Sequence, residues 1–537
     1  MTALPFIYRG LVFWMRLKKN NLNTLIFSIF VKLFSNISMM KNSVFLFFVF
    51  LVLFPSIALA QEYKPLRAEF SSKEFDQIRL IPASPNRVIV FKHYTKHNNR
   101  GDVWQVNGLD ERLNKIWTKD IMIPRSYQLN EYEICNDSIL HLLVVKNKGE
   151  NASFLKLRMN IINGSFSSHL FKGNRKSLLV GLKMYNGKLF LYGLGLENIQ
   201  EQLNKYNAET KYEKIVTTKI PSEYHIITAL ADTAHNRFVI LVKNTKSTNG
   251  ELRLLEFDKQ GEVTAANLLS SSSKHNIING NLVYSEDSEL LFIGTYNNSF
   301  SKSKRKTDNN AYGVFMGQIS NNRFDFFQFY RFSDFENIYK TLSYREQQKL
   351  KTMTAKGKQV ELSFKLLMHN KILKQNGQHV LVLESYYPVY HYESMYDARG
   401  YMYQTEVFDG YKTTYAVAIG FDNNGELLWD NYIQVKGVQN FYLDQSVTVY
   451  TDENTQVFMY YLNEKVYSKV NRKNETIYKR EATELPTVMS GEQVLLEENG
   501  RITHWHNSYF LISGYQKILD KRGKNRKVYF VMGISFE

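Results

Sequence analysis

The residues best suited to hydrolytic chemistry lie in a tyrosine-rich stretch of the chain. His391 stands within a few positions of Glu384, Glu393 and Asp397. Glycosidases use two carboxylates about 5–10 Å apart, and a nearby imidazole can move protons between such groups. Carboxylates in loops are usually only solvated, so the sequence assigns no catalytic residue. The cluster supports a hydrolase or lyase as an alternative.

Two other groups could bind a metal or act as a nucleophile. His504 and His506 would place two imidazoles on one face of a strand, but zinc needs a third ligand and none stands at a diagnostic spacing. Cys135 is the one cysteine, so no intramolecular disulfide can form. Beside the turn-forming Asn136 it is expected to be a small half-buried residue. The sequence predicts no metal and no cofactor.

Tyrosine and basic residues form a second kind of candidate site, one for binding. Tyrosine offers a rigid contact area with a polar tip, and lysine and arginine attract anionic groups. A protein, an anionic polymer or a glycan is therefore the expected partner, and no nucleic-acid motif is present. The candidate ligand-binding residues are Tyr386, Tyr387, Tyr390, Tyr392, Tyr396, Tyr401, Tyr403, Lys304, Arg305, Lys524 and Arg526.

A repeated pattern shows which elements must position these residues. An apolar strand ends in a polar residue and a turn, and a second apolar strand follows. Clear copies begin at Leu109, Phe257, Ile319 and Phe421, and weaker copies at Asn160, Asn207, Asn471 and Ser535. Tight turns at a spacing of about fifty residues interleave with them, as expected for four-stranded repeats. The prediction is an all-β fold, a single β-propeller, with eight blades favoured and seven open.

The ends of the repeat predict how the propeller closes. The last blade ends with its third strand, at Val528 to Ser535, and therefore lacks an outer strand. The stretch Tyr63 to Phe70 precedes the first blade and has no partner of its own. We expect this N-terminal strand to complete the last blade, because such closure removes a free sheet edge.

The first sixty residues indicate export. Residues 39–60 combine Lys41, an apolar run and Ala58-Leu59-Ala60, which is typical of a signal peptide cleaved before Gln61. Residues 1–38 are interpreted as an extra or mis-annotated extension, with a membrane anchor as the rival. Residues 61–537 form the propeller and contain no transmembrane stretch. The expected location is the periplasm or the cell exterior, with outer-membrane association open.

Charge and insertions indicate which face is used. The chain carries a net charge of +17, and a net +11 remains without the first sixty residues, which hold six basic residues and no acid. A helical insertion is expected at about 334–358 and a Tyr-rich insertion at about 386–411. In a propeller these connections and the basic loops share one face. Long loops on a rigid scaffold commonly carry function.

One hairpin suggests relatives. Phe421–Trp429 resembles the tryptophan-docking repeat of quinoprotein dehydrogenases and the Asp-box of sialidases. The glycine and the tryptophan each come one position too early for the docking repeat, and the glycine comes one position too late for the Asp-box. With the export signal and Glu384–Pro388, this hairpin makes the chain similar to uncharacterised secreted β-propeller proteins of Bacteroidota. That resemblance implies a location and a fold.

Two hypotheses about function remain. The favoured one is a non-catalytic binding or scaffold propeller that recognises a protein or polymer through its basic, Tyr-rich face. The alternative is a carbohydrate-active hydrolase or lyase with an axial site on that face. A hydrolase would need two carboxylates converging near the axis.

Overall fold

Short antiparallel sheets follow one another along almost the whole described chain. The computed structural model describes residues 66–72, 78–98, 101–146, 153–173, 178–210, 214–244, 251–269, 275–298, 310–357, 362–452, 455–485 and 491–536. All of them lie within the unit Pro65–Glu537. The predicted extension 1–38 and export signal 39–60 lie outside the described residues.

The first four sheets are numbered here in chain order. Sheet 1 contains β2 (Ile78–Ser84), β3 (Arg87–Asn98), β4 (Gly101–Leu109) and β5 (Lys115–Ile123). Sheet 2 contains β6 (Tyr127–Cys135), β7 (Ile139–Lys146), β8 (Phe154–Asn160) and β9 (Phe166–Phe171). Sheet 3 contains β10 (Leu178–Tyr185), β11 (Lys188–Leu194) and β12 (Lys214–Thr217). Sheet 4 contains β13 (Tyr224–Asp232), β14 (Arg237–Asn244), β15 (Leu252–Phe257) and β16 (Val263–Leu269).

The remaining sheets repeat the same order. Sheet 5 contains β17 (Asn276–Tyr284), β18 (Leu290–Asn297), β19 (Gly313–Ser320) and β20 (Arg323–Arg331). Sheet 6 contains β21 (Leu366–Met368), β22 (Leu373–Gln375), β23 (Gln378–Tyr396), β24 (Met402–Phe421), β25 (Leu427–Gln434) and β26 (Gln439–Asn440). Sheet 7 contains β27 (Val447–Asp452), β28 (Thr455–Leu462), β29 (Lys465–Arg472) and β30 (Glu475–Glu484). Sheet 8 contains β31 (Gln493–His506), β32 (Tyr509–Leu519), β33 (Asn525–Ser535) and β1 (Arg67–Ser71).

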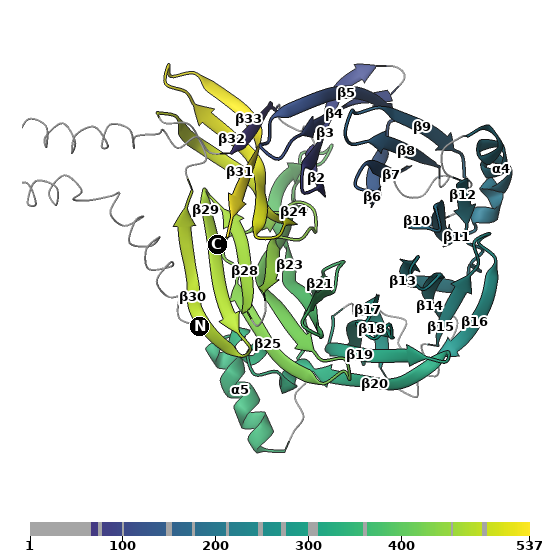
Figure 1. The fold of residues 1–537 in the computed structure, drawn as a ribbon. Coiled ribbons are helices and arrows are strands. Elements are labelled where there is room, and N and C mark those ends of the chain that lie inside the picture. Colours follow the sequence, from purple (N-terminus) through teal and green to yellow (C-terminus); the bar gives the residue numbers. More distant parts are fainter. Residues whose placement is uncertain are drawn as a thin grey trace, which may run out of the picture. The chain divides into compact units, whose positions relative to one another are not determined.

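The hydrophobic core lies between neighbouring sheets. In the described part of the chain, each cluster of buried apolar side chains combines two consecutive sheets, and one further cluster joins sheet 8 back to sheet 1. The first strands of the sheets face the inside of this ring and the last strands lie outside (Figure 1). Four-stranded antiparallel sheets packed in this way form a β-propeller.

The middle strands explain why the sequence reads as continuous apolar runs. Along β3, Val88 and Val90 pack into the cluster shared with sheet 8, whereas Ile89 and Phe91 pack into the cluster shared with sheet 2. Successive side chains of a strand point to opposite faces. Because both faces are covered, both sets must be apolar.

The N-terminal strand completes the last sheet. β1 pairs antiparallel with β33, from Arg67 opposite Met532 to Ser71 opposite Val528. Phe70 is buried in the cluster between sheets 8 and 1. The segment expected to supply the outer strand of the last sheet therefore does so in its described part.

Sheet 3 departs from the predicted repeat. The sequence placed a hairpin turn at Asn207, but Asn207 lies within the helix α4 (Gln200–Glu209), which follows the short helix η1 (Leu196–Ile199). The chain then returns as β12, which pairs parallel to β11. A parallel pair needs a long crossover rather than a turn, and α4 is part of that crossover.

Helices also occupy the connection before sheet 6. It contains η2 (Phe332–Asp334), η3 (Ile338–Thr341) and α5 (Tyr344–Ala355), and the last two lie within the interval, about 334–358, for which the sequence predicts helix. Ser343 caps α5: its hydroxyl accepts from the Glu346 amide, and the Glu346 carboxylate accepts from the Ser343 amide. Within the described ranges, no helix has the length and apolar character needed to span a bilayer.

Candidate functional site

The Tyr-rich insertion is an extension of two strands of sheet 6. β23 and β24 stay paired from His379 opposite Phe421 as far as Tyr396 opposite Met402. Their neighbours stop much earlier, because β21 pairs only with Leu383–Ser385 and β25 only with Tyr415–Phe421. Residues 386–411 therefore form a hairpin that is two-stranded except at Tyr411, which also pairs with β26, and we call this hairpin the arm.

A local turn closes the tip of the arm. The Asp397 carboxylate accepts hydrogen bonds from the backbone amides of Arg399 (2.8 Å) and Tyr401 (2.9 Å). Gly400 adopts a positive φ of 81°, which glycine allows without strain. Asp397 therefore holds the turn.

The arm exposes tyrosines on both of its faces. Because side chains alternate along a strand, Tyr386, Tyr390, Tyr392 and Tyr396 share one face, and Tyr387 lies on the other together with Tyr403, which pairs with Met395. Six of the seven tyrosines singled out from the sequence are exposed, from 43% for Tyr387 to 71% for Tyr396 and Tyr401. Tyr386, the seventh, is half-buried at the base. The structure thus brings the predicted tyrosines onto one projecting element.

Aromatic rings are packed against one another at the root of the arm. Phe408 is the centre of this group, with ring centroids 5.0 Å from Tyr411, 5.6 Å from Tyr390 and 5.7 Å from Phe441. The group continues to Tyr386 (5.5 Å from Tyr411) and to Tyr442 (5.2 Å from Phe441). We call these six residues the root patch. Sequence reasoning missed Phe441 and Tyr442, which belong to a different connection of the chain.

A buried carboxylate anchors the segment that carries Phe441. Glu384 is 1% exposed and accepts hydrogen bonds from the backbone amides of Ser446 and Val447, each at 3.0 Å, and pairs with His369 Nε2 at 2.8 Å. The Ser446 hydroxyl in turn contacts Asn440 Nδ2 at 3.2 Å. A satisfied buried network of this kind fixes one conformation, so the segment that carries Phe441 is held in place beside the arm.

Gly410 lets the arm and that segment approach closely. Its φ is +118°, and a Cβ there would lie 2.6 Å from the carbonyl oxygen of Asn440. β26 pairs with Tyr411 and Lys412 directly beside it. A side chain at position 410 would displace the Phe441 segment.

The arm is acidic, although the chain as a whole is basic. With histidine neutral, residues 386–411 carry a net charge of −3, from Glu393, Asp397, Glu406, Asp409 and Arg399. His391 lies 3.0 Å from Glu393 and 3.3 Å from Asp409, and its hydrogen bond to Glu393 raises the pKa of the imidazole. A partner with a positive surface would complement this arm.

The expected hydrolytic cluster around His391 is not brought together. Glu384 is buried in the anchor network, and Asp397 is engaged in the tip turn. Only Glu393 contacts His391 as the sequence suggested. The reason is strand geometry, since Glu384 and His391 stand seven residues apart on opposite faces of β23.

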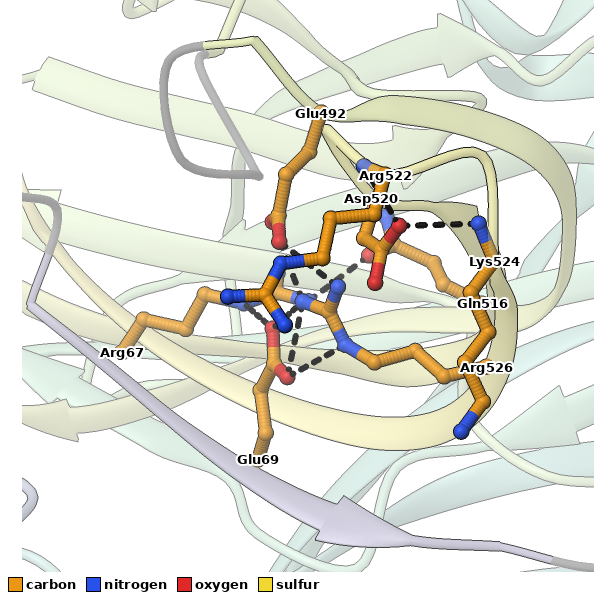
Figure 2. A network of polar contacts seen from close by, with 8 residues as sticks. All are labelled: Arg67, Glu69, Glu492, Gln516, Asp520, Arg522, Lys524 and Arg526. Atoms are coloured by element: carbon orange, nitrogen blue, oxygen red, sulfur yellow. Dashed lines mark hydrogen bonds and ion pairs between the residues drawn. The ribbon is translucent and has the colours of Figure 1, made fainter.

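The four basic candidates differ in where they lie and in what they contact. Lys304 and Arg305 lie outside the described residues. Lys524 is exposed at the turn between β32 and β33. Arg526 instead lies between Glu492 (2.6 Å) and Glu69 (3.1 Å), and these carboxylates hold the pKa of its guanidinium above the ordinary value (Figure 2). Its charge is therefore compensated by one carboxylate on β1 and one just before β31.

A polar cluster on the inner strands was not anticipated from the sequence. Glu131 and Glu133 of β6 each lie 3.4 Å from Lys183 Nζ of β10. Burial raises the pKa of Glu133, and the charges of Lys183 and Lys371 oppose that rise. The ion pairs therefore join the first strands of sheets 2 and 3. Two acids at alternate positions of a first strand were the available signal.

The two histidines make local contacts, and the cysteine is half-buried. The Nε2 of His504 contacts the carbonyl oxygen of Asn507 at 2.8 Å, and His506 stacks on Tyr509 at 4.9 Å. Burial raises the pKa of the Cys135 thiol to about 11, so it stays protonated at neutral pH. Within the described ranges, no three His, Cys, Asp or Glu side chains converge on a point that could hold a metal ion.

Comparisons with known proteins give weak similarities. No protein-family model matches the chain, and no curated protein matches it. Solved structures that match include the polysaccharide lyase Uly1 (TM-score 0.34, 9% identity, covering 76% of this chain and 90% of that one). Another is the β-propeller domain of the Trilobed protease from Pyrococcus furiosus (TM-score 0.31, 6% identity, covering 85% and 96%). A eukaryotic initiation factor also matches (TM-score 0.35, 8% identity, covering 87% and 90%). Similarities this weak say nothing about activity.

Proposed function

We propose that this chain is an exported binding propeller that docks a protein partner through its arm. The observation that carries the proposal is the set of exposed tyrosines on a two-stranded hairpin that projects from sheet 6. Isolated two-stranded hairpins are marginally stable in water. An arm of this kind gains cover for its apolar surface when a partner binds it.

The composition of the arm favours a protein over a glycan as the partner. Tyrosine, phenylalanine and methionine are enriched in protein interfaces, and the arm adds the exposed Met395 and Met402 to its tyrosines. Both faces carry aromatic side chains, as suits insertion between two walls of a groove. A sugar chain would instead be expected to stack on one face.

Photo-crosslinking tests the proposal. A photoreactive phenylalanine analogue replaces Tyr396 at the arm, and in a matched control it replaces Tyr344 of α5, which is 77% exposed. We expect a protein adduct from position 396 and none from position 344. Changing Tyr392, Tyr401 and Tyr403 to Ser in the 396 variant should abolish the adduct with an unchanged melting temperature, because exposed side chains contribute little to stability.

Three results would count against protein docking by the arm. They are equal adducts at positions 344 and 396, an adduct that survives the three serine substitutions, and binding on a glycan array that those substitutions remove. The last of these would make a polymer the ligand.

The export and the blade number are part of the proposal. Residues 39–60 support cleavage before Gln61, and N-terminal sequencing of the protein from the envelope or the medium checks it; an intact N-terminus would argue for the anchor. Eight blades are supported by the cyclic series of core clusters. An experimental density map with seven blades would overturn that number.

The hydrolase alternative is favoured by one observation, the proximity of Glu131 and Glu133 to a single ammonium group. Glycosidases act through a pair of carboxylates, and this pair would supply it. If this pair is catalytic, Glu133→Gln abolishes turnover of a polysaccharide panel without unfolding the protein. No turnover by the unaltered protein on that panel leaves the pair a structural link between sheets 2 and 3.

A further inference from the structure

The arm and the turn between β32 and β33 occupy equivalent places in their sheets. Each joins the second strand of its sheet to the third, counted from the inside of the ring. Because the sheets of a propeller repeat one orientation, connections of equal rank emerge on the same side of the disc. When two molecules meet with these sides facing, the arm of one can contact the β32–β33 turn of the other.

Their charges are opposite. The arm carries a net charge of −3, and Glu393 and Glu406 are exposed on it. Residues 520–524 carry a net charge of +2, from the exposed Lys521, Arg522 and Lys524 against Asp520. We call residues 520–524 the basic turn.

The basic turn is a formed structure. The Asp520 carboxylate accepts from the backbone amides of Arg522 and Lys524, each at 2.8 Å, and Gly523 adopts a φ of 76°. These bonds and the nearby guanidinium charges lower the pKa of Asp520, with the Lys524 amide as the largest cause. The turn therefore presents its cations from a fixed backbone.

The two features do not satisfy each other within one molecule. Among the described residues, no hydrogen bond, ion pair or ring contact joins the arm to Arg522 or Lys524. Opposite charges that share a side of the disc, and that stay apart in one copy, are free to pair between copies.

We propose that the partner of the arm is a second copy of this chain, with the arm of each copy seated on the basic turn of the other. Such a contact is reciprocal, so it closes as a two-fold dimer and does not propagate. The tyrosines supply the contact area, and the charged pairs set the register and suppress wrong pairings. This inference rests on the proposed docking role of the arm and names its partner.

Charge swapping tests the dimer by sedimentation velocity on the purified full chain. Wild type should sediment with twice the mass of one chain at micromolar concentration. One variant carries Glu393→Lys and Glu406→Lys, and a second carries Arg522→Glu and Lys524→Glu. Each should weaken the dimer by about tenfold or more, because like charges then face one another. A chain with all four substitutions should recover wild-type association.

Matched controls lie on outer strands. Glu475→Lys on β30 and Lys119→Glu on β5 change exposed charges away from both features. They should leave the dissociation constant of the dimer unchanged. All variants should have the melting temperature of the wild type.

Three results would overturn the inference. They are a monomeric wild type, charge reversal on one feature that weakens the dimer no more than the controls do, and a fourfold variant that does not recover dimer formation. The photo-crosslink separates this failure from that of the proposed function. If the chain is a monomer and position 396 crosslinks to a different protein, the docking role stands and only the dimer is refuted. If the chain is a monomer and position 396 gives no adduct, both the dimer and the docking role are refuted.

Discussion

At the scale of single residues, tryptophans join neighbouring sheets. The Trp117 ring covers Gly108, where a Cβ would lie 2.2 Å from the ring, and its Nε1 donates to the carbonyl oxygen of Ile161 in sheet 2 at 3.1 Å. Trp505 donates likewise to Ser84 of sheet 1 at 2.8 Å. These indoles are packing devices with a satisfied polar atom.

A buried lysine makes stability depend on pH. Lys156 of β8 is 1% exposed, its Nζ lies 3.1 Å from the hydroxyl of Tyr206 on α4, and burial lowers its pKa to about 7. Between pH 7 and the ordinary pKa of 10.5, the unfolded chain holds a proton that the folded chain does not. The free energy of unfolding therefore increases as pH rises through that interval. Below pH 7 the buried lysine lowers the free energy of unfolding most.

Replacing Lys156 with methionine tests this dependence. We expect Lys156→Met to stabilise the protein by about 1 kcal/mol or more at pH 6, because a buried charge is replaced by an apolar chain of similar size. The gain should shrink towards pH 10. Thermal melts at both pH values measure it, with the exposed Lys119→Met as the control. An equal shift at both pH values would contradict the assigned pKa.

Local residues were predictable, and distant ones were not. Asp110, Asp258 and Asp422 each accept from the amides two and four positions on, which any single turn sequence can indicate. The burial of Lys156 depends on Tyr206, fifty residues away, on a helix that the repeat pattern did not predict. Arg526 resembled a free basic tip because its acidic partners Glu69 and Glu492 are distant in sequence.

At the scale of elements, α4 substitutes for a missing outer strand in sheet 3. The side chain of Asn207 donates to the carbonyl oxygen of Ile215 at 2.7 Å and accepts from its amide at 2.7 Å. It thus satisfies the outward groups of β12 as a neighbouring strand would. Open strand edges invite association with other chains, so this asparagine protects the edge. An asparagine near a turn and one on a helix look alike in the sequence, which explains the misplaced hairpin.

Removing this side chain should expose the edge. Asn207→Ala leaves the amide and the carbonyl of Ile215 unpaired, and we expect a loss of about 1–3 kcal/mol. Chemical denaturation measures the loss, and light scattering on mild heating reports association. Asn204→Ala on the exposed side of α4 is the matched control. If both variants unfold alike, Asn207 does not guard the edge.

At the scale of the whole molecule, polar side chains link β1 to the other part of sheet 8 along what we call the seam. Arg67 reaches Glu69 and Gln516, each at 2.9 Å, and Arg526 joins Glu69 to Glu492 (Figure 2). The sequence could predict the closing strand from the missing outer strand of the last blade. It could not predict that Arg526 pairs with Glu69 and Glu492 in this seam.

Reversing the charge of Arg526 should weaken the seam. Arg526→Glu sets a third carboxylate beside Glu69 and Glu492, and we expect a loss of about 2 kcal/mol. Lys524→Glu, two residues away and exposed, should change the stability by about 0.5 kcal/mol or less. Differential scanning calorimetry compares the two. Equal melting temperatures would show that the seam contributes nothing to stability.

The pairing of β1 with β33 must also form late in the folding of the chain. Arg67 meets Met532 only after nearly all of the chain between them has been synthesised, and contacts so distant in sequence form slowly. A nascent or prematurely terminated chain would present β1 and the edge of an unfinished ring to chaperones and proteases. Completion of the ring would thus serve as a checkpoint that separates full-length molecules from fragments.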